Sequence, residues 1–261
     1  MKATWYKKTG SAQEVLEVGE METPRAKEDE VRIRVRSSGV NPADVKLRSG
    51  ASNYGYNFPL VIPNSDGAGI VDQVGFNVPI SLMNKRVWFF NGQRLGRALG
   101  SAAEFIALDK NFVTPLADYI SFEEGATLGI PAMTAYHSVF SDGPVSGKTI
   151  LVTGGSGAVG FYAVSLASWG GAKVIATVSN SNKAQNAILG GAKETINYKT
   201  ENIITRVAKL TDGKGVDRII SVDFADSLKW LTNVISKNGT VVAYASDTNR
   251  TPQIDFFQFM R

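Results

Sequence analysis

The chain of 261 residues is 43% hydrophobic and 20% charged, and it carries a formal net charge of +4. This composition is typical of a globular protein with one large domain or two ordinary ones, and the modest charge suits a phosphate-bearing ligand without requiring nucleic acid. The sequence has no cysteine and a single histidine, His137, which excludes disulfides, thiolate nucleophiles and zinc sites built from these residues.

Residues 1–120 contain short runs in which apolar and polar residues alternate. The first ten residues, MKATWYKKTG, have no long apolar block and are expected to form a strand, not a signal peptide. The run Val31–Arg36 alternates in the same way, among most of the prolines of the chain. No segment approaches the roughly 18 apolar residues of a membrane helix. We therefore expect a soluble, cytoplasmic protein that begins with a mostly β domain.

A different pattern follows residue 120. Residues 121–140 are expected to form two short helices, with Ser121 and Glu124 as a capping box. Strand-like and helix-like segments then alternate, which predicts βαβ units and a doubly wound parallel sheet. Strands are expected at 149–153, 173–178, 194–197, 216–222 and 240–245, and helices at 158–169, 181–190, 200–210 and 226–236.

The segment Val152–Gly160 (VTGGSGAVG) matches G-x-G-x-x-G between the first strand and first helix of this α/β domain. A pyrophosphate site needs a tight turn, a backbone free of side chains and a helix packed close to the strand. Free N–H groups at the helix N-terminus then bind the anion. The context favours a dinucleotide site, and a purely structural turn is the alternative.

The end of the next strand indicates which dinucleotide is bound. NAD sites usually place an acidic residue there, about 20 residues past the motif. Residues 177–183 read TVSNSNK and contain no acid. Their hydroxyl and amide groups and Lys183 would accept a 2′-phosphate, so NADPH is favoured over NADH. A solvated lysine on a polar loop is the alternative.

Several segments carry a family likeness in addition to these motifs. The chain resembles, along essentially its whole length, the zinc-independent, zeta-crystallin-like quinone oxidoreductases of the medium-chain dehydrogenase/reductase superfamily. The resemblance implies an α/β protein with a GroES-like β-barrel domain over 1–120, a Rossmann domain over 121–261, and a cleft between them for nicotinamide and substrate. The matching segments are Ser38–Asp44, Pro63–Val71, Leu128–His137, Gly154–Gly160, Lys183–Gln185 and Ile196–Tyr198.

The resemblance also implies roles for individual residues. Asn41, Asp44 and Lys46 would lie on the nicotinamide and substrate side as catalytic residues, and Asp44 could instead brace a helix. The cofactor-binding residues implied are Thr134 near the nicotinamide, Ser156, Gly157, Ala158 and Val159 at the pyrophosphate, Ser179, Lys183 and Tyr198 at the 2′-phosphate, and Phe224, Ala245 and Ser246 at later strand ends. Thr134 too could only brace a helix.

Two departures from related patterns affect the chemistry. Zinc-dependent relatives have a Cys where this chain has Asn41 and a His where it has Ser65, and neither replacement supplies a thiolate or imidazole. Many family members have a tyrosine where this chain has Lys46. In the family this tyrosine makes a hydrogen bond on the substrate side. Here Lys46 would supply a positive charge near the substrate oxygen, or the role would pass to Tyr54 or Tyr56. The alternative is that Lys46 points to solvent. Two further candidates for the cleft are Arg94 and Arg97.

The expected reaction is NADPH-dependent reduction of a quinone or an α,β-unsaturated carbonyl by direct hydride transfer, without a metal and with a proton from solvent. One alternative is a cofactor-binding, RNA-binding or structural crystallin-like protein with little turnover, although no dense basic patch supports nucleic acid as a partner. Another is an enoyl-thioester reductase of the same superfamily.

The C-terminal end leaves the predicted domain incomplete. Five strands are expected, whereas a complete double βαβαβ arrangement has six. The chain ends at 256–261, where the lead-in to a sixth strand is expected. The sequence therefore suggests a truncated chain, an exposed sheet edge and a homodimer for the full-length protein.

Overall fold

The computed structural model describes residues 1–51, 58–94 and 96–260. The chain divides into two compact units, Met1–Ile130 and Pro131–Arg261, which are called unit 1 and unit 2. The sequence placed the boundary earlier, after residue 120. Among the described residues, no helix is long and apolar enough to cross a membrane.

The segment after residue 120 belongs to unit 1 because it packs there. Helix α3 (Phe122–Gly125) starts with the predicted capping box: the Ser121 N–H donates to the Glu124 carboxylate at 2.8 Å, and the Glu124 N–H donates to the Ser121 hydroxyl at 3.1 Å. Ala126, directly after the helix, is buried in one cluster with Leu116. These contacts move the boundary toward the C-terminus.

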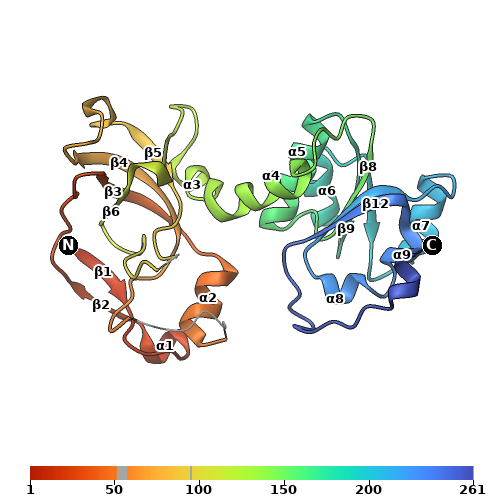
Figure 1. Cartoon of the computed structure of the whole chain (residues 1–261), viewed down its shortest axis with the longest axis horizontal. Helices are drawn as coiled ribbons and strands as arrows, with labels where there is room; N and C mark the ends of the chain where they lie inside the picture. The colour runs from red at the N-terminus through yellow and green to blue at the C-terminus, as the bar shows by residue number, and fades with distance from the viewer. Residues whose placement is uncertain (52–57, 95, 261) are drawn as a thin grey trace. The chain divides into compact units, whose positions relative to one another are not determined.

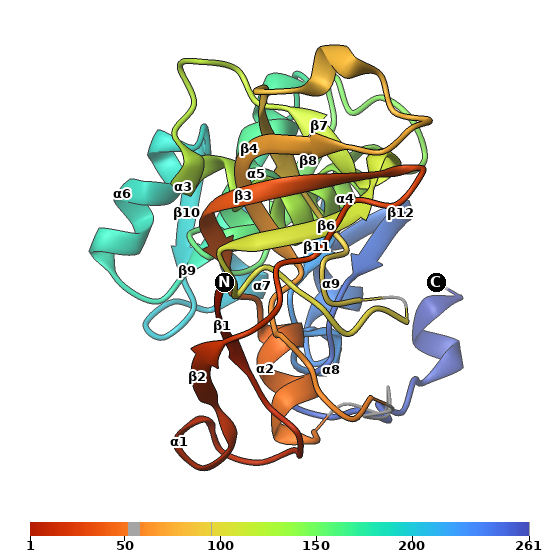
Figure 2. The same cartoon turned by 90° about the vertical axis from the view of Figure 1, so that its left-hand side faces the viewer.

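Unit 1 is built from antiparallel strands, as the alternating pattern predicted. A five-stranded sheet has the order β6-β3-β4-β5-β7, and β1 pairs with β2 separately. Figure 2 shows β3 between its neighbours β4 and β6. The strands are β1 (Lys2–Trp5), β2 (Glu17–Glu20), β3 (Glu30–Gly39), β4 (Asp66–Val74), β5 (Arg86–Phe89), β6 (Phe105–Asp109) and β7 (Val113–Pro115).

Strand β3 shows how the alternation builds the core of unit 1. Val31 and Ile33 are fully buried in a cluster with residues of β4, β5 and β6. Arg32, between them, faces the other side, where its guanidinium pairs with Asp72 at 2.9 Å. The helical segments of unit 1, besides α3, are α1 (Ala12–Val15), α2 (Pro42–Ser49), η1 (Ile80–Leu82), η2 (Lys110–Phe112) and η3 (Leu128–Ala132), which ends across the boundary.

Unit 2 contains a parallel sheet with the order β10-β9-β8-β11-β12. This is the order of the first five strands of a doubly wound nucleotide-binding sheet, and it confirms the predicted fold class. Figure 1 shows helices against this sheet. The strands are β8 (Thr149–Val152), β9 (Lys173–Val178), β10 (Glu194–Asn197), β11 (Val216–Ser221) and β12 (Ile235–Ala243).

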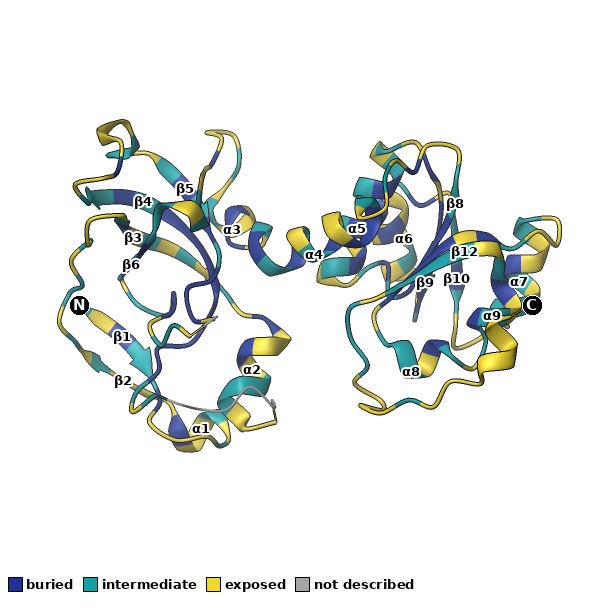
Figure 3. Ribbon diagram, in the orientation of Figure 1, coloured by how far each residue is buried: buried dark blue, intermediate teal, exposed yellow. Residues whose placement is uncertain are grey.

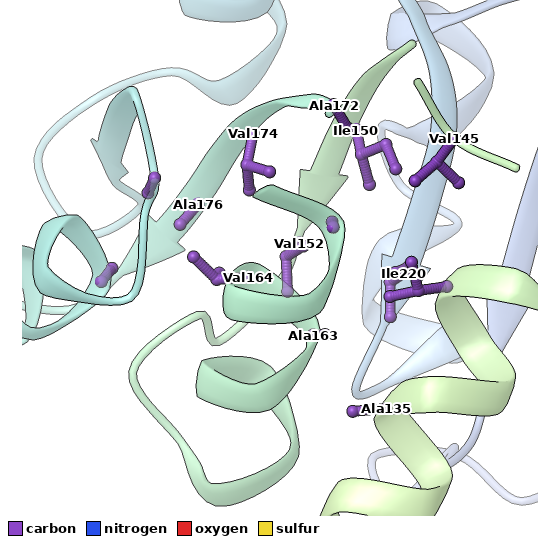
Figure 4. Close-up of a cluster of buried hydrophobic side chains, with 14 of the residues drawn as sticks. Ala135, Val145, Ile150, Val152, Ala163, Val164, Ala172, Val174, Ala176 and Ile220 are labelled. Carbon is purple, nitrogen blue, oxygen red and sulfur yellow. The ribbon is translucent and has the colours of Figure 1, made fainter. Parts of the chain in front are cut away.

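Alternating residues of the strands face two separate cores in unit 2. Ile150 and Val152 of β8 pack with Ala163 and Val164 of α5, as Figure 4 shows. Leu151 faces the opposite core, with residues of α7 and α9. Because both faces are covered, the inner strands β8, β9 and β11 are buried except at Thr149, Lys173 and Asp217 near their starts (Figure 3). The helices are α4 (Met133–Phe140), α5 (Ala158–Trp169), α6 (Ser181–Leu189), α7 (Ile203–Leu210), α8 (Phe224–Ser227), α9 (Leu231–Val234) and η4 (Phe256–Phe259).

The predicted single helix over 226–236 is wrong. Two short helices, α8 and α9, occupy this region, and Trp230 between them has non-helical φ and ψ of −144° and −16°. Strand β12 then starts at Ile235 because this residue pairs with Val216. A register shift follows, in the region where Asn238 adopts a positive φ of 62°.

Candidate functional site

The glycine loop of unit 2 joins the end of β8 to the start of α5. The Thr153 N–H donates to the Ile220 carbonyl at 2.9 Å, which continues the sheet into the loop. Gly154 adopts a positive φ of 61°, and its N–H donates to the Thr177 hydroxyl at 3.1 Å. The Gly155 N–H donates to the Thr177 carbonyl at 3.0 Å. Strand β9 thus holds the turn in place.

The glycines of the loop differ in how much space a Cβ atom would have. A Cβ on Gly155 would lie 2.6 Å from the Cβ of Ala176, which is too close for two carbon atoms. A Cβ on Gly160 would overlap the Gly154 carbonyl oxygen. A Cβ on Gly157 would lie 3.3 Å from the same oxygen, a tight but less severe contact. Gly155 and Gly160 are therefore required by packing, whereas Gly157 lies exposed at the mouth of the turn.

The N-terminus of α5 is open to an anion. The helix has 12 residues, and Gly157 at its N-cap supplies no side-chain hydrogen bond. The first N–H groups of a helix have no partner within the helix and carry a partial positive charge. The first turn contains no acidic residue, and Ala158 in it is exposed. The predicted residues Ser156 and Val159 are half-buried beside this turn. By contrast, Asn180 caps α6 through its side chain.

The structure brings the predicted 2′-phosphate residues to neighbouring strand ends. Ser179 directly follows β9, and Lys183 lies exposed in the first turn of α6. The Lys183 N–H donates to the Asn180 side chain at 2.9 Å, which fixes the start of that helix. Tyr198 follows β10, and its N–H donates to the Val178 carbonyl at 3.1 Å. The N-cap of α6, directly after β9, is therefore the neutral Asn180 and not an acidic residue.

Two other predicted segments are joined by hydrogen bonds after β11 and β12. The Phe224 N–H donates to the Ala245 carbonyl at 2.9 Å. The Asp223 carboxylate accepts hydrogen bonds from the Thr248 N–H and hydroxyl, each at 2.9 Å. Burial acts to raise the pKa of Asp223, but the hydrogen bonds to its carboxylate, those from Thr248 among them, outweigh it, so the pKa is lowered. Ser246 donates from its hydroxyl to the Asn249 carbonyl at 2.6 Å, within the same loop.

Thr134 lies in α4 and is not linked to the other predicted residues by any bond in the described part of unit 2. Its carbonyl accepts a hydrogen bond from the Ser138 hydroxyl at 2.7 Å. The same helix holds an unexpected partner: Arg218 of β11 is fully buried and donates to the Ser138 and Val139 carbonyls, both at 2.8 Å. The guanidinium also pairs with Asp142. Burial lowers the pKa of Arg218.

In unit 1 the predicted residues Asn41, Asp44 and Lys46 lie on or beside α2. Asn41 is the N-cap residue, and its N–H donates to the Asp44 carboxylate at 2.8 Å. Asn41 and Asp44 are buried, whereas Lys46 is half-buried in the last turn. The structure thus supports a helix-bracing contact for Asp44, the alternative that the sequence left open.

A buried polar network extends from α2 to β4. The Ser65 hydroxyl lies within hydrogen-bond distance of two acceptors, the Asp44 carboxylate at 3.2 Å and the Gln93 carbonyl at 3.0 Å, and its one hydrogen serves one of them at a time. The Asn41 side-chain amide donates to Asp66 Oδ2 at 2.8 Å. Two residues that stand where zinc-dependent relatives have ligands, Asn41 and Ser65, are therefore engaged with carboxylates. Within the described ranges, no three His, Cys, Asp or Glu side chains form a group that could hold a metal ion.

Burial raises the pKa of both carboxyl groups in this network. It raises the pKa of Asp66 to about 6, against hydrogen bonds from the Ile130 N–H and Asn41, and the negative charge of Asp44 adds to the rise. Burial also raises the pKa of Asp44, although the Asn41 N–H and Ser65 oppose it. Both groups stand apart from ordinary surface carboxylates, and such perturbed groups are frequent at functional sites.

Four further residues were predicted to line the cleft or contact the substrate: Arg94, Arg97, Tyr54 and Tyr56. The Arg97 guanidinium donates to the Gly92 carbonyl at 3.1 Å and to the Ala107 carbonyl at 2.6 Å, so it braces the loop. Arg94 is exposed. Tyr54 and Tyr56 lie outside the described residues.

Comparison with known proteins gives the family. Two family models match, the alcohol dehydrogenase GroES-like domain over residues 27–118 and the zinc-binding dehydrogenase over residues 158–261. The quinone oxidoreductase of Rattus norvegicus is 32% identical over 231 residues, which cover 88% of this chain and 68% of that protein. The chain belongs to the quinone oxidoreductase family. The Homo sapiens quinone oxidoreductase is 31% identical, with 89% of this chain and 70% of that protein covered.

Solved structures of quinone oxidoreductases share the fold. That of Pseudomonas syringae pv. Tomato DC3000 has a TM-score of 0.86 and 29% identity, and the match covers 99% of this chain and 78% of the other. The Escherichia coli quinone oxidoreductase complexed with NADPH has a TM-score of 0.85 and 25% identity, with 98% and 77% covered. Together with the sheet order, these matches confirm the predicted GroES-like and Rossmann domains.

Sequence reasoning did not single out three charged residues that lie beside the candidate site residues: Asp66, Arg218 and Asp223. Arg218 stands within the strand-like run 216–222 and Asp66 at the start of β4, and neither pattern gives a warning that a charge is buried. Asp223 directly follows the predicted strand 216–222, at the strand ends where ligand-binding residues gather in α/β sheets, and that position was a usable signal.

Proposed function

We propose that the protein catalyses the NADPH-dependent reduction of quinones, and of α,β-unsaturated carbonyls, by direct hydride transfer without zinc. The observation that carries the proposal is the open N-terminus of α5 behind a glycine loop that admits no side chain at Gly155 and Gly160. An anion-binding helix end in this strand-turn-helix setting fits a dinucleotide pyrophosphate.

The residues present fit NADPH. Ser156, Gly157, Ala158 and Val159 would surround the pyrophosphate, with the Ser156, Ala158 and Val159 N–H groups as donors, because the Gly157 N–H already donates to the Gly154 carbonyl at 2.8 Å. Phe224, Ala245, Ser246 and Thr134 are proposed to hold the nicotinamide half. When bound, NADPH supplies the hydride.

The end of β9 supports NADPH over NADH. Ser179 and Asn180 follow the strand, and no acidic side chain stands there to bind a ribose 2′-hydroxyl or to repel a 2′-phosphate. Lys183 adds a positive charge in the first turn of α6, and Tyr198 lies on the neighbouring strand end. These three side chains, Ser179, Lys183 and Tyr198, are proposed to bind the 2′-phosphate.

Unit 1 is proposed to act on the hydride acceptor. Asn41 and Lys46 would position the acceptor oxygen and stabilise its developing negative charge, and Asp44 would hold Asn41 in place. Zinc independence is proposed because the chain has no cysteine and one histidine, so the usual ligand sets cannot be assembled from these residues.

NADPH oxidation, followed at 340 nm with a panel of quinones and enones, tests the proposal. We expect turnover with at least one acceptor, a higher kcat/KM with NADPH than with NADH, and unchanged rates after dialysis against a zinc chelator. Binding of NADPH without oxidation by any acceptor would instead favour a cofactor-binding protein. Loss of activity on chelation that zinc restores would refute zinc independence.

A homodimer in the cytoplasm is proposed for the assembly. Within the described chain, β12 has β11 as its one strand partner, and an open edge of this kind can pair with a second copy. Sedimentation of the purified protein at micromolar concentration tests this state, and a monomer at that concentration would contradict it.

A further inference from the structure

Asp66 is an unusual residue of unit 1 because a carboxyl group stands fully buried at the first position of β4. Its Oδ2 atom accepts two hydrogen bonds, one from the Asn41 side-chain amide and one from the Ile130 N–H, both at 2.8 Å. Its carbonyl also accepts a hydrogen bond from the Ser101 hydroxyl at 2.5 Å. The residue thus joins the N-cap of α2 to the last residue of unit 1 through one oxygen atom.

The other carboxyl oxygen of Asp66 has no partner among the described residues. Oδ1 is buried and accepts no hydrogen bond. It lies against Gly129, where a Cβ would overlap this oxygen. A buried oxygen without a hydrogen-bond partner lowers the free energy of unfolding. The presence of a carboxyl group at position 66 therefore calls for an explanation other than stability.

The charges near Asp66 do not compensate for its burial. Asp44, across the Asn41 side chain, is a second buried carboxyl and raises the pKa of Asp66, whereas Arg94 lowers it. Asp44 belongs to α2 and Arg94 to the loop after β5. Burial is the largest cause and leaves the pKa at about 6. The ionised carboxylate is therefore kept at neutral pH in a site that disfavours it.

We propose that Asp66 is a positioning residue for the acceptor side of the reaction, and that it acts by fixing the orientation of the Asn41 amide. Asn41 is held at two points: its backbone N–H is bound by Asp44, and its side chain is bound by Asp66. With one Nδ2 hydrogen donated to Asp66, the second N–H of the Asn41 side-chain amide has a fixed direction, and this is the group that can donate to the acceptor oxygen. This inference rests on the proposed function, in which Asn41 contacts the acceptor.

A double-mutant cycle tests the proposal on the full chain. Asp66→Ala and Asn41→Ala are each expected to lower kcat/KM for the quinone by about tenfold, the typical effect of one charge-assisted hydrogen bond. The loss of kcat/KM in the double variant should be no greater than the loss in the more impaired single variant, because the two residues act as one unit. NADPH affinity, measured by fluorescence, should stay within about twofold, since unit 2 is proposed to bind the cofactor.

Asp72→Asn is the matched control. Asp72 lies on the same strand β4 and is paired with Arg32, and within the described residues no hydrogen bond or ion pair joins its side chain to the α2 network. This variant should retain wild-type kcat/KM even where its melting temperature falls. If Asp66→Ala fails to fold, Asp66→Asn replaces it, because the amide has nearly the same shape and lacks the charge.

The outcomes separate the positioning role from the reaction itself. Wild-type kcat/KM in both Asp66 variants, or a double variant whose loss is the product of the single losses, would overturn the role of Asp66. A loss equal to that of Asp72→Asn would also overturn it, because it would report stability alone. Absence of turnover in the wild-type protein would refute the proposed function, and with it any role of Asp66 in that reaction.

Discussion

The glycine loop of unit 2 and the Asp66 network of unit 1 build their sites in opposite ways. The loop uses backbone N–H groups and the absence of side chains, and its geometry is fixed by contacts of Gly155 with Ala176 and of Gly160 with Gly154. The network uses buried side chains, with Asn41 between two carboxyl groups. A backbone site is revealed by spacing in the sequence, whereas a side-chain network becomes visible only after strands and helices are placed together.

The two regions should also differ in how they fail. A side chain added to the loop displaces backbone and damages fold and binding together. A changed side chain in the network leaves the backbone in place and alters charge or orientation. The following predictions test this difference.

The largest effect is expected from Gly160→Ala. Its Cβ would overlap the Gly154 carbonyl oxygen, so helix α5 must move away from the loop. We expect a loss of about 3 kcal/mol in the free energy of unfolding, as for other overpacked sites, and no measurable NADPH binding. Urea denaturation and fluorescence titration measure the two effects.

Gly157→Ala is the matched variant for that experiment. Its Cβ would lie 3.3 Å from the same oxygen, a contact that small shifts can relieve. We expect near-normal stability with NADPH binding weakened by about tenfold, because the methyl group would meet the pyrophosphate. Equal stability losses in the two variants would contradict the distinction between packing and ligand approach.

Asp66→Asn should change how stability depends on pH. The folded-state pKa is about 6 and the usual value is 3.8, so the folded protein binds this proton more tightly than the unfolded chain. The stabilisation from protonation is present below about pH 4 and is lost as pH rises through 6. Each pKa unit corresponds to about 1.4 kcal/mol, which gives up to about 3 kcal/mol for this shift.

The measurement is the difference in unfolding free energy between wild type and Asp66→Asn from pH 4 to 8. Relative to the variant, the wild type should become less stable as pH rises. Asp44 titrates in both proteins and contributes to each curve in the same direction. Parallel curves over this range would show that Asp66 is not the group with the raised pKa.

Lys183→Ala should weaken NADPH binding by about fivefold, because one exposed positive charge opposite a phosphate contributes roughly 1 kcal/mol. NADH binding should not change, since NADH lacks the 2′-phosphate. Lys193→Ala, an exposed lysine before β10, is the control. The same fractional loss for NADPH and NADH would place Lys183 elsewhere than at the 2′-phosphate.

The smallest effect is expected from Asp223→Asn, with a loss of about 1 kcal/mol at pH 7. The hydrogen bonds from Thr248 favour the charged carboxylate. Because the folded-state pKa is lowered, this stabilisation is present above the ordinary pKa and is lost as the medium is acidified. Asp226→Asn, on the same helix and paired with Lys229, is the control. Thermal melts at pH 7 should separate the two variants.

The sequence predicted the strand-turn-helix position of the glycine loop, but it did not predict the buried contacts of the side-chain network. Glycine spacing and the strand-helix alternation were sufficient for the loop and for the presence of all five strands of the parallel sheet, although β12 begins at Ile235 and not at 240 as predicted. The helix predicted over 226–236 failed because a strand pairing at Ile235 overrides local helix preference. Asp66 could not be predicted as a buried partner of Asn41, since 25 residues separate them and only the fold joins β4 to the N-cap of α2.

The buried Arg218 sets the smallest piece of the chain that can fold by itself as a nucleotide-binding domain. Its buried guanidinium donates to carbonyl groups of α4 and is paired with Asp142, all of which precede β8. A fragment that starts at Thr149 would contain every strand of the sheet and still leave this charge buried without a partner. A fragment that starts at Pro131 carries its own counter-charge, and we expect it to express as a folded domain where the shorter one aggregates.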